Sequence, residues 1–219
     1  MKSLFSMTTA VTLATIGTCA AAPPAAKQQY VVLWNQNSNF GGSVNSQNYE
    51  PAMGAYDDAA ADDFTVPAGQ KWFISEVDVM GAYVDGSGPA ASVNVTFWRN
   101  KNGEPYRIAH RGHSSFTLNC TDNAGSFQCV LPTDSHNNPM TRLTPGTWWV
   151  SVAANCDSQT CGTWNWTENT SVTGYGAEWR NGPGGFHIRE CYGWAPLPTC
   201  FGGSPADLAF TLIGYSKPV

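Results

Sequence analysis

Short segments in which apolar and polar residues alternate recur along most of the chain, and each segment ends at Gly, Pro, Asn or Asp. The clearest is residues 91–98, where Val93, Val95 and Phe97 occupy every second position. Successive side chains of a β-strand point to opposite faces, so this period predicts a strand with one buried face. Further strands of this kind are expected at residues 30–34, 71–83, 115–119, 127–131, 146–153, 162–166 and 208–215.

The connections between these segments are short and rich in turn-forming residues. The chain contains 22 Gly and 14 Pro, which favour tight turns. No segment has apolar residues at helical spacing over a length that could connect two parallel strands. The pattern therefore predicts an all-β fold, and an antiparallel β-sandwich of jelly-roll type fits it best.

Composition and charge narrow the class of partner. Hydrophobic residues make up 42% of the chain, which excludes an intrinsically disordered protein. The formal net charge is −5, whereas binding to nucleic acid needs clustered Lys and Arg. We expect neither a nucleic-acid partner nor a transmembrane segment, because no apolar run reaches the length of a spanning helix.

The amino-terminal residues have the organisation of a secretory signal peptide. Lys2 precedes an apolar, hydroxyl-bearing run at residues 4–16, and small residues follow at 18–22, as cleavage requires. Residues 16–18 match poorly the pattern that precedes a lipidated cysteine, here Cys19. The sequence predicts a signal peptide at 1–22, a flexible lead at 23–29 and a single β-sandwich domain at 30–219.

Six cysteines remain after the signal peptide, and they fall into three pairs that are close in sequence. Six cysteines allow fifteen connectivities, and a secreted protein favours disulfides over free thiols. The pairs lack the spacing of a zinc knuckle, and no histidine lies suitably beside them. We expect the bridges Cys120–Cys129, Cys156–Cys161 and Cys191–Cys200.

The segment AADDFTVPAG at residues 60–69, followed by Trp72, Ile74 and Val77, resembles a group of secreted bacterial jelly-roll proteins of uncharacterised function. The resemblance covers most of the mature chain. It continues through residues 88–90, 93–95, 164–166, 181–186 and 207–210. Pro183 departs from the glycine-rich pattern of one loop, so the resemblance does not predict the shape of that loop. The resemblance implies a galactose-binding-like sandwich and attachment to a glycan or surface, and it assigns no catalytic residue.

Five aspartates form the most conspicuous acidic group of the sequence. Four lie within seven positions and the fifth precedes the last predicted strand: Asp57, Asp58, Asp62, Asp63 and Asp207. Carboxylates on loops at the rim of a sandwich are suitable ligands for calcium. Alternatively, the first two form a solvated turn and the next two cap backbone amides at the start of a strand.

Aromatic residues gather among glycines and cysteines in the last third of the chain. They are Trp164, Trp166, Tyr175, Trp179, Phe186, Tyr192 and Trp194. Flat aromatic rings can stack on the apolar C–H faces of sugars, and such a groove would place Trp164, Trp166, Tyr175, Trp179 and Trp194 against a glycan. The alternative is that these rings belong to the core.

Candidate catalytic groups are fewer. Glu168 shares the strand parity of Trp164 and Trp166, and with Glu178 or Glu190 it could form the acid–base pair of a glycan hydrolase or lyase. Four histidines, at 110, 113, 136 and 187, could hold a transition metal only if distant loops converge.

Together these features favour a secreted, monomeric β-sandwich that binds an extracellular glycan or cell-surface polymer without catalysis. Calcium is the one cofactor that the sequence suggests. A jelly-roll hydrolase or lyase is the alternative, and a purely structural surface protein is the second alternative.

Overall fold

The computed structural model describes residues 28–109 and 114–219. The predicted signal peptide, Cys19, most of the lead and the histidines at 110 and 113 lie outside the described residues.

The largest sheet forms one layer of the fold. Its strands are β3 (Gln47–Asn48), β4 (Asp58–Val66), β7 (Ser92–Lys101), β8 (Glu104–Ile108), β9 (Ser115–Leu118), β13 (Gly146–Asn155), β15 (Glu178–Asn181) and β16 (Ala195–Pro196). The strand order is β16–β15–β4–β13–β7–β8, with β3 beside β13 and β9 beside β7. The pairing of β3 with β13 is parallel, and the other pairings of this sheet are antiparallel.

Two smaller antiparallel sheets form the second layer. One contains β1 (Val31–Asn35), β5 (Gln70–Val79), β10 (Thr121–Asn123), β11 (Ser126–Val130), β12 (Thr141–Leu143) and β18 (Phe210–Pro218). The other contains β2 (Phe40–Asn45), β6 (Gly81–Val84), β14 (Thr163–Asn169) and β17 (Asp207–Leu208). Three short helical segments complete the described chain: η1 (Pro51–Tyr56), η2 (Arg189–Cys191) and α1 (Leu197–Phe201).

The two smaller sheets are joined where the chain crosses from one to the other. Residues 71–83, expected as one strand, are interrupted at Met80, and residues 208–215 are interrupted at Ala209. The Met80 N–H donates to the Ala209 carbonyl (3.1 Å), and the Thr167 N–H donates to the Met80 carbonyl (2.9 Å). The expectation of uninterrupted strands was wrong because both segments serve two sheets.

The hydrophobic core lies between the two layers. Phe64 of β4 is fully buried and packs against two aromatic residues of the opposite layer. Its ring stacks on Trp72 with centroids 6.2 Å apart, and it meets Phe210 edge-on at 6.4 Å. Val93, Val95 and Phe97 are buried as the alternation predicts. The protein is therefore an all-β antiparallel sandwich of jelly-roll type, as the sequence indicated.

The three predicted disulfides are confirmed. Cys120–Cys129, Cys156–Cys161 and Cys191–Cys200 each close a loop within a short stretch of sequence. Stable disulfides are typical of proteins from oxidising compartments. Among the described residues, no helix has the length and apolar character needed to cross a membrane.

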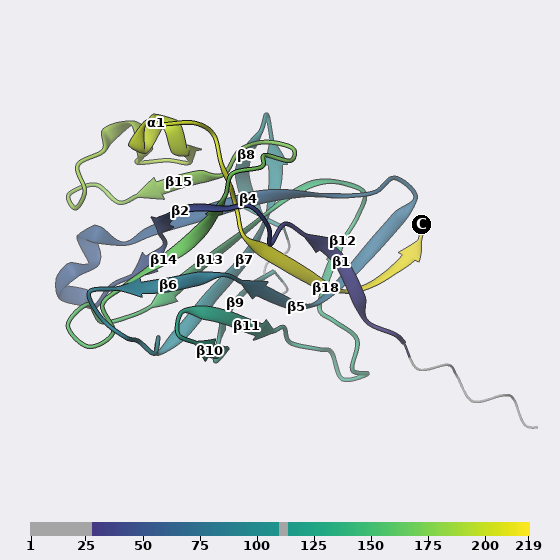
Figure 1. Ribbon diagram of the computed structural model, residues 1–219. Helices are drawn as coiled ribbons and strands as arrows, with labels where there is room; N and C mark the ends of the chain where they lie inside the picture. The colour runs from purple at the N-terminus through teal and green to yellow at the C-terminus, as the bar shows by residue number, and fades with distance from the viewer. Residues whose placement is uncertain (1–27, 110–113) are drawn as a thin grey trace, which may run out of the picture.

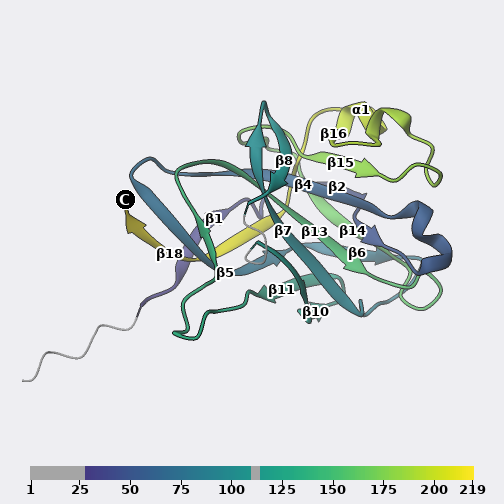
Figure 2. The ribbon, with the colours of Figure 1, turned by 180° about the vertical axis from the view of Figure 1, so that it is seen from behind.

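The helix α1 and the strand β15 lie together at the end of the sandwich that is remote from the C-terminus (Figure 1). The view from behind also shows α1 and β15 far from the C-terminus (Figure 2). The Cys191–Cys200 bridge ties α1 to η2 at this end.

Candidate functional site

The tryptophans of β14 are part of the core and do not form an exposed platform. Trp164 and Trp166 are fully buried. The Trp164 Nε1–H donates to the Gly125 carbonyl (2.7 Å), and the Trp166 Nε1–H donates to the Ala209 carbonyl (2.9 Å). The prediction that these two indoles face a ligand was wrong, because the face of β14 that carries them is the core face.

The five aspartates serve the backbone. Each carboxylate accepts a hydrogen bond from a main-chain amide of another segment: Asp57 from Tyr49, Asp58 from Gln47, Asp62 from Leu208, Asp63 from Tyr175 and Asp207 from Thr173. Residues 58 and 62 of β4 are about 13 Å apart along an extended strand, and residues 62 and 63 point to opposite faces.

One calcium ion therefore cannot collect all five predicted ligands. The described residues contain no group of three or more His, Cys, Asp or Glu side chains that could hold a metal ion. The expectation of a solvated turn at Asp57 and Asp58 also needs correction, because Asp58 is buried and begins β4.

Burial shifts the titration of these carboxyl groups. It raises the pKa of Asp63 to about 7 and that of Asp207 to about 6. Asp62 is completely enclosed, and burial together with the nearby Asp207 carboxylate raises its pKa well above the ordinary value. The interior of the sandwich therefore favours the protonated forms of these acids.

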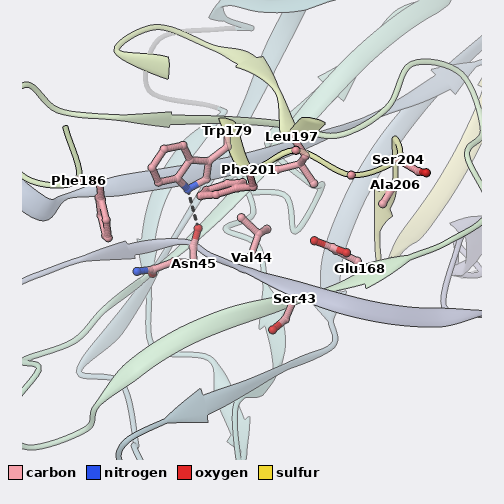
Figure 3. A pocket seen from close by; sticks show the side chains of 12 residues that line it. Ser43, Val44, Asn45, Glu168, Trp179, Phe186, Leu197, Phe201, Ser204 and Ala206 are labelled. Atoms are coloured by element: carbon pink, nitrogen blue, oxygen red, sulfur yellow. Dashed lines mark hydrogen bonds between the residues drawn. The ribbon is translucent and has the colours of Figure 1, made fainter. Parts of the chain in front are cut away.

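A cavity of about 390 Å³ opens where the two layers separate at the α1 end. It lies between β2 and β14 on one side and β15 and α1 on the other (Figure 3). Its lining comprises Ser43, Val44, Asn45, Glu168, Trp179, Phe186, Leu197, Phe201, Gly202, Gly203, Ser204 and Ala206.

Aromatic rings form one wall of this cavity. The ring centroid of Phe201 lies 4.8 Å from that of Trp179, and Phe186 lies 5.6 Å from Trp179. The Trp179 Nε1–H donates to the Asn45 carbonyl (2.9 Å), which ties β15 to β2. Phe201, at the end of α1, is 54% exposed, so its ring is accessible from solvent.

A carboxylate without a protein partner faces this wall. Glu168 lies two residues after Trp166 on β14, so its side chain points to the same face of the strand as the buried Trp166 indole. The core ends at this position, and the Glu168 side chain lines the cavity. Its carboxylate forms no hydrogen bond or ion pair with any described residue. Figure 3 shows it directed towards the apolar side chains of Val44, Leu197 and Phe201. The cavity thus combines an aromatic wall with a free hydrogen-bond acceptor.

The two carboxyl groups that the hydrolase alternative requires do not lie together in the cavity of Glu168. Glu178 precedes Trp179 on β15 and so points to the other face of the strand. Glu190 lies on η2, and neither residue lines the cavity of Glu168. Burial, and secondarily the Glu104 carboxylate, raises the pKa of Glu178 to about 8. The predicted pairing of Glu168 with Glu178 or Glu190 was therefore wrong for this cavity.

The remaining predicted ligand residues are dispersed. Tyr175 is exposed and stacks on Trp149, with centroids 6.2 Å apart. Trp194 packs edge-on against Trp98 at 5.7 Å. Of the five predicted ligand residues, only Trp179 lines the cavity.

Sequence reasoning missed Phe201 and the polar residues of β2, and it assigned Glu168 only to catalysis. The pair Gly41–Gly42 beside Glu168 was the available signal, since adjacent glycines within a strand indicate close approach of another group.

Comparison with known proteins adds little to the assignment of a function. No family model matches the chain, and no curated protein matches it. Among solved structures, it is similar to one described as the cysteine protease and lectin-like domains of Cwp84, a surface layer associated protein of Clostridium difficile. The identity is 14% and the TM-score is 0.48, over 90% of this chain and 37% of that chain.

Proposed function

We propose that this chain is a secreted, non-catalytic binding module that holds an extracellular glycan in the cavity of Glu168 and Phe201. The observation that carries the proposal is the unpartnered Glu168 carboxylate opposite an accessible aromatic wall. A carboxylate accepts hydrogen bonds from sugar hydroxyls, and aromatic rings pack against the apolar C–H faces of a pyranose.

The size and charge of the cavity favour a neutral sugar. A volume of about 390 Å³ lies at the lower end of the range of small-molecule sites, which suits one or two sugar units. The net charge of −5 and the carboxylate in the cavity both oppose an acidic polysaccharide.

Secretion fits this role. The signal-like residues 1–22 and the three disulfides both favour an extracellular protein, and extracellular polymers are then the accessible partners.

Retention on insoluble polysaccharides tests the proposal. Wild-type protein is mixed with cellulose, chitin, β-1,3-glucan and mannan, and the bound fraction is measured. Phe201→Ala should lose retention on whichever polymer holds the wild type, while its melting temperature stays near that of the wild type. Tyr106→Ala is the matched control, because Tyr106 is an aromatic residue of similar exposure (56%) on β8.

Retention of Phe201→Ala equal to that of the wild type would exclude this cavity as the site. Absence of retention of the wild type on all four polymers would favour a purely structural surface protein.

A further inference from the structure

The sheet that contains β5 and β18 has one face in the core and one face directed away from it. On β5, Trp72 and Val77 are buried in the core. Phe73, Glu76 and Asp78 point to the opposite side, which we call the outer face, and are half-buried. An irregularity in the pairing of β5 with β18 changes the parity between Phe73 and Glu76, so both side chains belong to this face.

Three cations surround the Phe73 ring at one end of the outer face. The Lys71 and Lys217 ammonium nitrogens lie 5.8 and 5.2 Å from the ring centroid, and the Arg142 guanidinium lies 5.7 Å from it. Lys217 is directly opposite Lys71 in the pairing of β18 with β5, and like charges in this position destabilise a sheet. Arg142 forms an ion pair with Asp134 (2.8 Å), but neither lysine has an ion pair within the described part of the chain.

Two carboxylates lie farther along β5 on the same face. Glu76 and Asp78 are two positions apart, so their side chains point the same way. Burial, and secondarily the Glu76 carboxylate, raises the pKa of Asp78 to about 6. Neither carboxylate forms an ion pair with any residue in the ranges 28–109 and 114–219. The outer face therefore carries a basic group and an acidic group, and each consists of like charges without a counter-charge.

The two groups are too far apart to neutralise each other within one chain. Lys71 and Glu76 are about 16 Å apart along an extended strand. A two-fold axis that crosses β5 between them, in the plane of the interface, would place Lys71 of one copy over Glu76 of a second copy. The same axis places Glu76 of the first copy over Lys71 of the second, because a two-fold interface makes each contact twice.

Exposed apolar side chains lie beside the acidic group. Val130 and Ile213 pair with Glu76 from the two neighbouring strands, and Val32 pairs with Ile213. Val130 is 69% exposed and Val32 is 58% exposed, which is a high exposure for side chains on one contiguous sheet face.

The outer face is large enough for a specific interface. β5 has 10 residues and β18 has 9, so at ~3.3 Å per residue the face is about 30 Å long, and four strands side by side make it about 19 Å wide. Two such faces in contact cover about 1,100 Å² in total, above the roughly 1,000 Å² that a specific interface needs.

We infer that the outer face docks a second copy of this chain in a two-fold symmetric dimer, in which Lys71 and Lys217 of each copy lie against Glu76 of the other. The sequence led us to expect a monomer. The dimer gives each group of like charges its counter-charge and covers Val130 and Val32.

The dimer leaves the cavity of Glu168 open in both copies. No residue that lines this cavity belongs to the outer face, and α1 and β15 lie at the other end of the sandwich from the end of β18 (Figure 1). If the cavity holds a glycan as proposed above, the dimer presents two such sites and gains avidity for a repeating polymer.

Sedimentation equilibrium tests the inference without any glycan. The purified protein should change from the mass of one chain to twice that mass as its concentration rises to about 100 µM. Lys71→Glu and Glu76→Lys should each weaken dimerisation at least about a hundredfold, because each substitution enters the interface twice and places like charges face to face.

Neither substitution should harm the fold. Lys71→Glu places an opposite charge across from Lys217, and Glu76→Lys places one beside Asp78, so both relieve repulsion within one chain. Melting temperatures are compared at a concentration low enough for the wild type to be monomeric as well, and they should be no lower than that of the wild type. Arg107→Glu on the exposed strand β8 is the matched control and should dimerise as the wild type does.

An equal mixture of the two variants tests the pairing itself. In a heterodimer of Lys71→Glu with Glu76→Lys, opposite charges face each other at both copies of the contact. The mixture should therefore recover a dimer with at least the affinity of the wild type, although each variant alone stays monomeric.

Three results would overturn the inference. They are a wild type that remains monomeric at every concentration, a dimer that neither Lys71→Glu nor Glu76→Lys weakens, and a mixture of these variants that does not recover a dimer. Each of them leaves the proposed function intact, because the measurement contains no glycan and the cavity of Glu168 is unchanged in every variant.

Discussion

The carboxylate of Glu168 lies directly against the backbone of Gly42 on the neighbouring strand. A Cβ atom at Gly42 would come within 2.8 Å of Glu168 Oε2, closer than non-bonded atoms approach. The absence of a side chain on β2 therefore leaves the space in which the Glu168 carboxylate lies at the edge of the cavity.

Gly42→Ala should consequently displace the Glu168 carboxylate and weaken glycan binding about tenfold, the effect of losing a hydrogen bond to a charged group. Binding is measured by titration with an oligosaccharide of the retained polysaccharide. Gly193→Ala is the control, because a Cβ at Gly193 meets no atom within 4 Å. Equal affinity of the two variants would show that the position of the Glu168 carboxylate is not important for binding.

Trp166→Ala should destabilise the fold instead of removing a ligand contact. Trp166 is fully buried and packs edge-on against Phe210, with centroids 6.2 Å apart. Loss of this packing should cost about 3 to 5 kcal/mol, measured by denaturant unfolding. A stable Trp166→Ala variant that has lost only glycan binding would contradict the burial of this face.

The helix α1 carries Phe201, so the adjacent disulfide should support binding more than the other bridges do. Cys191–Cys200 and Cys120–Cys129 have the same sequence separation of 9. Replacing either pair by serines should therefore cost a similar amount, about 2 to 3 kcal/mol. Glycan affinity, measured below the melting temperature of both variants, should fall only when Cys191 and Cys200 are replaced. An equal fall in both would show that the bridge does not position Phe201.

The stability of the fold should decrease as the pH rises. The folded-state pKa values of Asp207, Asp63 and Glu178 are raised to about 6, 7 and 8, against about 4 in the unfolded chain. An acid whose pKa is raised in the folded protein contributes stability that is fully present when the pH is below its pKa in the unfolded chain. This contribution is lost as the pH rises through its pKa in the folded protein.

Melting temperatures between pH 4.5 and 8.5 check this dependence. The wild type should melt at progressively lower temperature above about pH 5, and Glu178→Gln should show a shallower decrease above pH 6. Glu190→Gln, an exposed control on η2, should follow the wild type. A melting temperature that rises across this range would contradict the raised pKa values.

The sequence predicted the features that depend on local pattern. Alternation at Val93, Val95 and Phe97 located a strand and its buried face, and short separations paired the cysteines correctly. Both depend on residues within about ten positions of each other, so a single segment contains the necessary information.

The features that the sequence did not show depend on distant partners. β4 contains buried aspartates, and aspartates in a sequence usually indicate a turn. The N–H group that donates to Asp62 belongs to Leu208, which is 146 residues away, so the local pattern did not show that Asp62 lies in a buried strand. Trp166 and Glu168 share one strand parity, yet one enters the core and the other lines a cavity. The difference arises from how far the opposite layer extends, which alternation cannot encode.

Blocking the cavity without removing any native packing tests the central claim most directly. Ser204 is exposed and lines the cavity, so Ser204→Trp should fill the space beside Phe201. Calorimetric titration with an oligosaccharide of the retained polysaccharide should show at least about a tenfold loss of affinity, equivalent to about 1.4 kcal/mol, with an unchanged melting temperature. Ser135→Trp, in an exposed turn, should bind as the wild type does. Wild-type affinity in Ser204→Trp would contradict the assignment of this cavity as the glycan site.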